Sequence, residues 1–178
     1  MNINSTKNQL RKELRAKRKA LDQVEVAVRS QELVRLLIEK IDWARASNIH
    51  CFLPLFDDNE PDLRAFIEYA LDKNSNVYTS NPNPQTGRRI TGLQDDDKQN
   101  KLFQFRLEEK IKFDYIVIPM LGFDPVTKHR LGFGGGFYDQ LLASQPDSKK
   151  IGVCFNEFTV DALPVESHDV PLDKIVSI

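Results

Sequence analysis

The sequence predicts a three-layer α/β fold, in which helices cover both faces of a mainly parallel sheet, as a single domain over residues 1–178. Residues 115–121 form an almost unbroken apolar run, which is typical of a strand buried on both faces of a parallel sheet. Strand-like and helix-like segments alternate along the chain, and no repeat or low-complexity linker divides it. A chain of 178 residues can bury one adequate core, so we predict one domain.

Two helices are predicted at the N-terminus. The first covers residues 7–21, and Asp22 is a suitable N-cap for a second helix over residues 24–41. Among the apolar positions of the second helix are Val24, Val28, Leu33, Leu37 and Ile41.

The first of these helices carries a basic stripe. At about 100° per residue, four cations fall on one helical face and three leucines fall on the adjoining face. Such a stripe is either a solvated helix face or an anion-binding surface, and the pattern alone leaves both interpretations open. The cations are Lys7, Arg11, Arg15 and Arg18, and the leucines are Leu10, Leu14 and Leu21.

Strand and helix patterns alternate through the rest of the chain. Residues 48–53 are predicted as a strand that ends at Pro54, because proline cannot donate to a sheet ladder. An acidic, turn-rich loop over residues 55–62 follows. The later predicted elements are a helix at 62–71, strands at 76–80 and 88–93 with a turn at 81–87 between them, a polar segment at 94–112, the strand at 115–121, a helix at 137–144, a strand at 150–155 and a short C-terminal strand.

A glycine-rich loop separates the strand at 115–121 from the helix at 137–144. Gly132, Gly134, Gly135 and Gly136 are predicted to allow positive φ and a close approach of the backbone to a ligand. A glycine-rich turn before a helix N-terminus suits a phosphate, and Lys128 and Arg130 add positive charge beside it. The alternative is a purely structural turn, since the string matches neither GxGxxG nor GxxxxGK[ST].

Composition excludes several classes of protein. Hydrophobic residues make up 40% of the chain and charged residues 29%, and no apolar run is long enough to cross a bilayer. A net charge of −1 argues against a general nucleic-acid binder. The charged N-terminus lacks the apolar core of a signal peptide, so we expect a cytoplasmic protein. Cys51 and Cys154 lie in apolar runs and are interpreted as buried hydrophobic residues, with no disulfide, metal or nucleophile role assigned.

Four segments of the chain stand out as motifs: RLGFGGGFYD at residues 130–139, KNQLR at residues 7–11, LPVESHDVPLDKIV near the C-terminus and LPLFDDNEPD at residues 53–62. Together they resemble the 5-formyltetrahydrofolate cyclo-ligase family, also called methenyltetrahydrofolate synthetases. RLGFGGGFYD is similar to the family signature RLGYGGGYYDR, and KNQLR is similar to its KxxLR element. LPVESHDVPLDKIV near the C-terminus resembles LPVEPHDVPLDAVV. LPLFDDNEPD, at residues 53–62, resembles LPLPGEVDT, with FDDNE where the family has PGE.

The resemblance implies an enzyme that uses ATP and Mg²⁺ to close 5-formyltetrahydrofolate to 5,10-methenyltetrahydrofolate. It implies ATP contacts from Lys7, Asn8, Gln9, Leu10 and Arg11 and from the loop residues Arg130, Leu131, Gly132, Phe133, Gly134, Gly135, Gly136, Phe137 and Tyr138, of which Arg130 and Tyr138 are assigned to catalysis. It also implies folate contacts from Leu55, Glu60, Phe133, Gly134, Gly135, Gly136 and Phe137, and Mg²⁺ binding by Asp139 and Asp169.

Several of these assignments have alternatives, most of them without a role in ligand binding. Phe56 competes with Leu55 for the aliphatic folate contact, and we choose Leu55. Glu60 could instead be an acid near the N-terminus of the following helix. Asp139 could be a helix-start acid and Asp169 a turn carboxylate, and His168 is interpreted as a structural or solvent-facing residue.

The chain also departs from the family pattern. A Gly-Ile-x-Glu-Pro-like segment is absent from residues 94–112, phenylalanines replace tyrosines at Phe133 and Phe137, and Gln140 replaces an arginine. Gly135 stands where some members have lysine. The rival hypothesis is therefore a non-catalytic relative that binds a nucleotide or folate. In either case we expect a monomer with a small-molecule ligand and no nucleic-acid or membrane partner.

Overall fold

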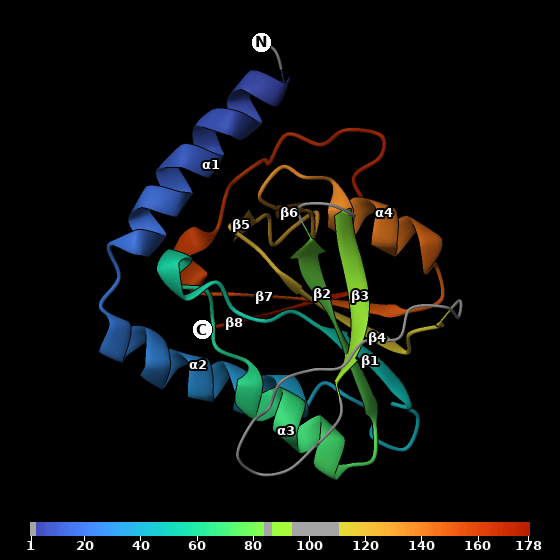
Figure 1. Cartoon of the computed structure of the whole chain (residues 1–178). Coiled ribbons are helices and arrows are strands. Elements are labelled where there is room, and N and C mark those ends of the chain that lie inside the picture. Colours follow the sequence, from blue (N-terminus) through green and yellow to red (C-terminus); the bar gives the residue numbers. More distant parts are fainter. Residues whose placement is uncertain (1–2, 84–86, 94–110) are drawn as a thin grey trace.

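The centre of the fold is a six-stranded sheet with the order β3-β2-β1-β4-β7-β8, seen in the computed structural model that describes residues 3–83, 87–93 and 111–178 (Figure 1). All neighbouring strands pair in parallel except β2 and β3, which are antiparallel. The predicted mainly parallel α/β fold is thus confirmed. The strands are β1 Asn48–Cys51, β2 Asn76–Asn83, β3 Gly87–Leu93, β4 Tyr115–Pro119, β7 Lys149–Cys154 and β8 Lys174–Ser177.

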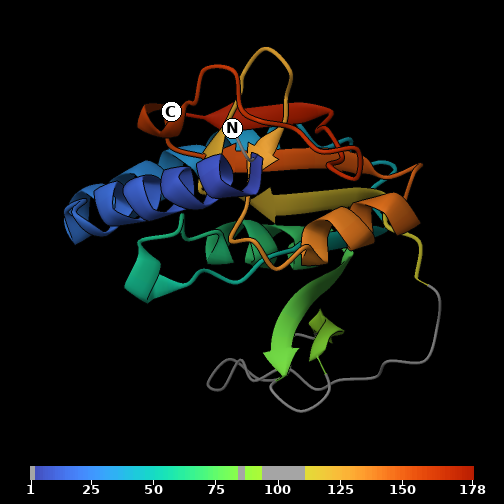
Figure 2. The same cartoon turned by 90° about the horizontal axis from the view of Figure 1, so that it is seen from above.

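Helices cover both faces of the sheet. In Figure 1, α2 (Gln23–Ile38) and α3 (Arg64–Asp72) lie below the sheet, whereas α1 (Ile3–Lys19) and α4 (Phe137–Ser144) lie above it. Figure 2 shows the sheet from the side of α1 and α4, with β4 running between the flanking strands. The predicted three layers are therefore present. None of the helices in the described part of the chain is both long and apolar enough to cross a membrane.

The core is built around β4. Every residue of this strand is buried, because β1 and β7 pair with its two edges and helices cover both of its faces. The predicted buried strand is therefore correct, although it ends at Pro119. Cys51 in β1 and Cys154 in β7 are also buried, and burial raises the pKa of both thiols, that of Cys154 to about 12.

The apolar stripe of α2 was partly misassigned. Asp22 does cap the helix, accepting hydrogen bonds from the backbone N–H groups of Val24 and Glu25. Val24 and Val28, however, are 72% and 61% exposed. The helix packs on α3 and β8 through a stripe that keeps the predicted Leu33 and Leu37 but not Val24 and Val28, and it ends at Ile38 rather than at 41. Its buried apolar residues are Val26, Leu33, Val34 and Leu37.

The predicted turn at 81–87 is wrong at both of its ends. β2 continues to Asn83 and pairs with β3 from Gly87, so regular sheet hydrogen bonds override the turn preferences of these asparagines and prolines. Residues 84–86 lie outside the described part of the chain, as do residues 94–110, which include most of the predicted polar segment and the place where the family segment is absent.

The other predicted elements exist with shifted ends. β1 ends two residues early, α3 begins at Arg64, and α4 has the predicted bounds. Four short elements were not predicted because they are too short for a periodic pattern. They are the strands β5 (Gly122–Phe123) and β6 (Arg130–Leu131), which pair as a hairpin, and the 3-10 turns η1 (Phe56–Asp58) and η2 (Asn156–Phe158). The hairpin is inserted between β4 and the glycine-rich loop, so that β6 leads directly into the loop.

Candidate active site

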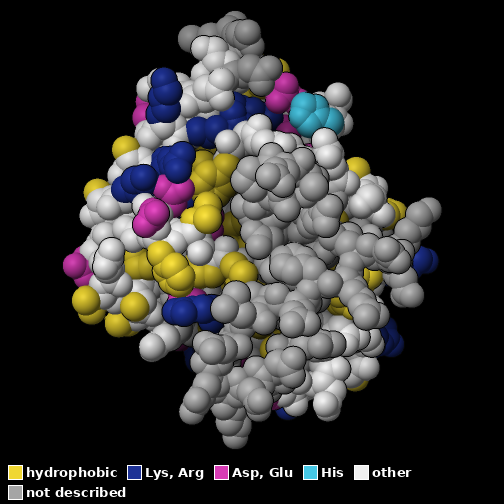
Figure 3. Space-filling model, viewed as in Figure 1, with side chains coloured by type: hydrophobic (Ala, Val, Ile, Leu, Met, Phe, Trp, Pro, Cys, Tyr) yellow, Lys and Arg dark blue, Asp and Glu magenta, His cyan; other side chains and the backbone are white. Residues whose placement is uncertain are grey.

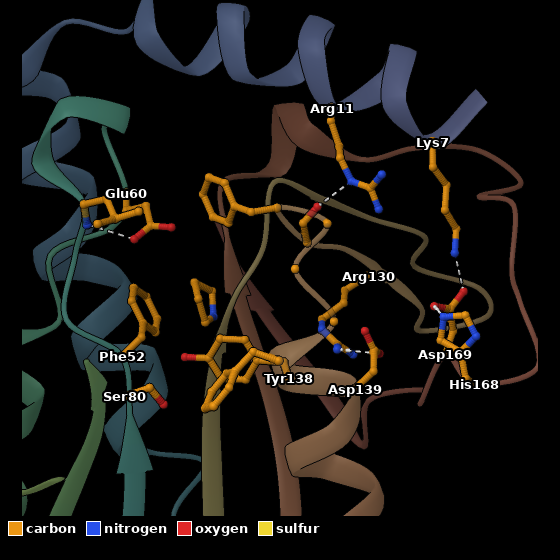
Figure 4. Close-up of a pocket in the computed structure, with 18 of the residues that line it drawn as sticks. Lys7, Arg11, Phe52, Glu60, Ser80, Arg130, Tyr138, Asp139, His168 and Asp169 are labelled. Carbon is orange, nitrogen blue, oxygen red and sulfur yellow. Dashed lines mark hydrogen bonds and ion pairs between the residues drawn. The ribbon is translucent and has the colours of Figure 1, made fainter. Parts of the chain in front are cut away.

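A pocket of about 680 Å³ opens where β1 and β4 end. The chain that leaves β1 forms one wall, and the glycine-rich loop with the start of α4 forms another. Residues of α1 and of the C-terminal loop close a third side (Figure 4). The carboxyl edge of a parallel sheet is the usual position of a ligand site, because the loops that follow the strands converge there.

The pocket has an ionic half and an apolar half. On the face seen in Figure 3, basic side chains gather where α1 lies, next to exposed hydrophobic side chains. The ionic half is defined by Lys7, Arg11, Arg130, Asp139, Glu166 and Asp169, and the apolar half by Phe52, Leu53, Pro54, Leu55, Pro119, Phe133, Phe137 and Tyr138.

Lys7 is an almost buried cation held by two carboxylates. Its Nζ lies 2.9 Å from Glu166 and 2.5 Å from Asp169, and its side chain is only 5% exposed. Burial alone would raise the pKa of Asp169, but the backbone N–H of Glu166 and the Lys7 ammonium outweigh burial and lower that pKa. Burial likewise opposes the charge of Lys7, and the two carboxylates still raise its pKa. Both groups are therefore charged at neutral pH.

Arg130 and Asp139 form a second ion pair across the glycine-rich loop. Arg130 Nη2 lies 2.7 Å from Asp139 Oδ1, and Nη1 donates to the carbonyl of Val170 at 3.0 Å. Arg130 comes from β6 and Asp139 from the first turn of α4, so the loop between them brings the two side chains together (Figure 4). Each predicted phosphate-binding cation in these two pairs contacts a predicted metal-binding carboxylate.

Arg11 lies directly against the glycine-rich loop. Its Nε donates to the carbonyl of Gly132 at 3.0 Å, and its Nη1 donates to Asn8 at 2.7 Å. Gly134 has φ 95° and Gly136 has φ 64°, so both adopt the predicted positive φ. Gly132 and Gly135 do not, and the prediction is wrong there because two left-handed residues suffice to turn the chain into α4.

Of the two candidates for the aliphatic folate contact, Leu55 lines the apolar half of the pocket and Phe56 does not. Leu55 lines the pocket, whereas the ring of Phe56 lies 5.0 Å from the guanidinium of Arg64 and does not line it. Phe133 packs under the guanidinium of Arg18 at 5.3 Å, which holds this ring at the pocket wall. Figure 4 shows Tyr138 between Phe52 and Arg130, where the two halves meet.

Glu60 is buried beneath the apolar half. It is 2% exposed and accepts a hydrogen bond from the backbone N–H of Leu55 at 2.9 Å. The alternative interpretation, a helix N-terminal acid, is wrong because α3 begins only at Arg64. Arg18 Nη2 lies 3.7 Å from Glu60 Oε1, so a buried cation stands behind this carboxylate.

Arg18 of α1 hydrogen-bonds to two other segments near the pocket, the loop after β1 and the end of β4. It is 1% exposed and donates to the carbonyls of Asp58 at 2.7 Å and Met120 at 3.0 Å. Burial lowers its pKa, and nearby Glu60 opposes that shift. Arg15 forms two hydrogen bonds with the Asp58 carboxylate, at 2.9 and 2.8 Å. The interpretation of the basic stripe as a solvated face is thus wrong for Lys7 and Arg18, which are buried.

Most of the predicted site residues converge on the pocket, but three do not. Gln9 is exposed and donates to Glu13, Leu131 is 1% exposed within the core, and Leu10 is not part of the described pocket wall. The prediction took these residues because they lie within matching motifs, and a motif does not tell which side of a helix or strand faces the ligand. The pocket residues that were not predicted are Phe52, Leu53, Pro54, Ser80, Pro119, Glu166 and His168.

The carboxylates supply oxygen ligands that suit Mg²⁺, but in two separate groups. Ligand atoms of Glu166, His168 and Asp169 lie within 4.8 Å of one another, and this group does not include Asp139. His168 is exposed, as predicted. A hard cation prefers the carboxylate oxygens to the imidazole. The signal that could have added Glu166 is its position three residues before Asp169 in the matching C-terminal motif.

The fold and the site together define an α/β protein with a two-part pocket at the carboxyl edge of its sheet. The sequence model of the 5-formyltetrahydrofolate cyclo-ligase family matches residues 3–178. The chain therefore belongs to the 5-formyltetrahydrofolate cyclo-ligase family.

Individual relatives agree with this assignment over nearly their whole length. The 5-formyltetrahydrofolate cyclo-ligase of Haemophilus influenzae is 28% identical over 183 residues, covering 96% of this chain and 96% of the relative. That of Escherichia coli K12 is 27% identical over 178 residues, covering 92% and 96%. The solved structure of a 5,10-methenyltetrahydrofolate synthetase from Mycoplasma pneumoniae superimposes with a TM-score of 0.74 at 26% identity, covering 96% of this chain and 97% of that one.

Proposed function

We propose that this protein converts 5-formyltetrahydrofolate and ATP to 5,10-methenyltetrahydrofolate, ADP and phosphate. The observation that carries the proposal is the pairing of an ionic half and an apolar half in one pocket of a chain from this family. The ionic half suits a triphosphate, and the apolar half suits the flat bicyclic ring of a folate. Their junction at Tyr138 is where the formyl oxygen and the γ-phosphate would meet.

The chemistry requires positioning rather than a protein nucleophile. The formyl oxygen of the substrate attacks the γ-phosphorus, and the bond to the bridging oxygen breaks to release ADP. The N10 amine then attacks the activated formyl carbon, N10 loses its proton, and the carbon–oxygen bond breaks to release phosphate. A site for such phosphoryl transfer must align the two substrates and neutralise charge.

Arg130, Lys7 and Arg11 are the cations that would bind the phosphates. Arg130 and Lys7 are already paired with carboxylates, so the nucleotide replaces one anionic partner with another and leaves no cation uncompensated. The carboxylates of Asp139 and Asp169 are the residues that would then hold Mg²⁺ through hard oxygen ligands. When bound, Mg²⁺ supplies further neutralisation of the phosphate charge.

The backbone of the glycine-rich loop would complete the phosphate site. Gly134 and Gly136 present the loop to the pocket without a Cβ, and the N-terminus of α4 adds the positive end of its dipole. On the opposite wall, Leu55 and Glu60 would contact the folate ring. Arg130 and Tyr138 are assigned to the reacting end because they line the junction of the two halves.

The test is a coupled measurement on the full-length chain. With Mg-ATP and 5-formyltetrahydrofolate, we expect methenyl-folate absorbance to appear together with an equimolar amount of ADP. Arg130→Ala should abolish turnover, whereas Lys128→Ala should not, because Lys128 is exposed and does not line the pocket. Binding of both ligands without turnover would instead support the rival hypothesis of a non-catalytic relative.

A further inference from the structure

Ser80 is a pocket residue with a buried histidine behind it. Ser80 lies on β2, two residues beyond the last parallel pair with β1, which joins His50 to Tyr78. Side chains alternate along a strand, so Tyr78 and Ser80 point to the same face of the sheet as His50. His50 Nε2 and Ser80 Oγ are 2.6 Å apart, a short hydrogen bond.

His50 is fixed in place and uncharged. Its side chain is fully buried, and burial lowers its pKa to about 3, so the ring is neutral at physiological pH. Phe113 and Tyr138 contact the imidazole in edge-on geometry, with ring centroids 5.6 and 5.8 Å away. A ring held in this way can orient the hydroxyl of Ser80 but has no route of its own to a ligand in the pocket.

The hydroxyl of Ser80 retains hydrogen-bonding capacity toward the pocket. A serine hydroxyl offers one donor and two acceptor sites, and His50 occupies only one of them in either tautomer. Figure 4 shows Ser80 below Phe52, on the side of the pocket that also carries Glu60. Ser80 is half-buried and shares the pocket lining with Phe52, Leu53 and Pro119, so a ligand atom that meets this hydroxyl gains a hydrogen bond beside apolar side chains.

We propose that Ser80 is a specificity-determining residue that hydrogen-bonds the polar edge of the bound bicyclic ring, and that His50 is its positioning residue. This inference rests on the proposed function, since it assigns the apolar half to a nitrogen heterocycle. An apolar pocket holds a flat ring by contact area alone, whereas a fixed hydroxyl favours rings that carry a donor or acceptor at the matching edge.

The experiment is a double-mutant cycle read by ligand binding. Affinities for 5-formyltetrahydrofolate and for ATP are measured separately by calorimetry on the parent chain, Ser80→Ala, His50→Phe and the double variant. We expect Ser80→Ala to weaken folate binding about fivefold to tenfold, the effect of one neutral hydrogen bond, and to leave ATP binding unchanged. His50→Phe should give a similar loss, and the double variant should be no worse than Ser80→Ala alone.

Two further variants separate positioning from stability. His50→Gln, which keeps a hydrogen-bonding side chain, should restore part of the lost folate affinity. Ser30→Ala removes a buried hydroxyl from α2, where it donates to the carbonyl of Val26, and should not change folate binding. Parent-like folate affinity in Ser80→Ala, or additive losses in the double variant, would overturn the inference. Because the readout is binding, it is independent of whether the parent chain turns over.

Discussion

The ionic and apolar halves of the pocket use charge in opposite ways. In the ionic half, Lys7 and Arg130 are paired with carboxylates that line the same pocket, so an anionic ligand can replace those partners. Behind the apolar half, Arg18 is sealed among backbone carbonyls next to Glu60, and it does not line the pocket. The first arrangement is suited to ligand exchange, and the second fixes the wall against which a ligand packs.

Removing Arg18 should have the largest effect, and it should act on stability. Arg18→Met leaves two buried carbonyls without this donor and removes the guanidinium 3.7 Å from Glu60, which should lower the free energy of unfolding by about 3–5 kcal/mol. Urea denaturation measures this loss. The matched control is Arg35→Met, because Arg35 is exposed and its ion pairs with Glu32 and Glu39 contribute little. Equal losses in the two variants would mean that Arg18 does not organise the pocket wall.

Asp139 provides the sharpest test of the ionic half. Asp139→Asn keeps the side-chain shape but removes the negative charge that pairs with Arg130 and is proposed to bind Mg²⁺. Turnover should fall about 10²–10³-fold, on the scale of losing one preorganised electrostatic group, with little change in melting temperature. Asp147→Asn, at an exposed site, is the control. Nearly normal turnover with only a small loss of stability would identify Asp139 as a helix-start acid only.

A substitution at Gly134 tests the contact between the glycine-rich loop and Arg11 of α1. A Cβ at this position would lie 3.3 Å from Cζ of Arg11, and the residue has φ 95°. Gly134→Val should therefore strain the loop, displace Arg11 and weaken ATP binding by roughly tenfold or more, with folate binding less affected. Gly135→Ala is the control for loop strain, because its Cβ would meet no protein atom within 4 Å and its φ is not positive. Normal ATP affinity in Gly134→Val would place the phosphate site elsewhere.

The sequence predicted the ionic half better than the apolar half. Arg130 and Asp139 stand nine residues apart in one motif, and Lys7 and Asp169 each lie in a segment with a family resemblance. Ser80 and Phe52 lie in no such motif, and they reach the pocket only because β1 and β2 pair in register. That register, like the role of Arg18 behind the wall, depends on long-range packing that a local pattern does not contain.

The fold was predictable where local pattern and packing agree. The run of β4 is apolar because it is buried on both faces, and Asp22 caps α2 with its own side chain, so both features are visible in the sequence. The exposed Val24 and Val28 show the opposite case. The apolar residues of α2 can be grouped into more than one stripe along the helix. Only the position of α3 and β8 decides which stripe is buried.

The smallest expected effect concerns the pH dependence of the Lys7 pair. The pKa of Asp169 is lowered in the folded protein, because the Glu166 N–H and Lys7 outweigh the opposing effect of burial. A lowered folded-state pKa means that the contribution of Asp169 to stability is complete above its ordinary pKa of 3.8 and is lost as the pH falls through the lower folded value. The stability difference between the parent chain and Asp169→Asn, measured by urea denaturation, should therefore shrink as the pH falls from about 5 to about 2.

The comparison with Asp169→Asn isolates this residue from other carboxylates with lowered pKa, such as Asp58, which titrate in both proteins. A difference that stays constant over this range would show that Lys7 and the Glu166 N–H do not stabilise the charged form of Asp169.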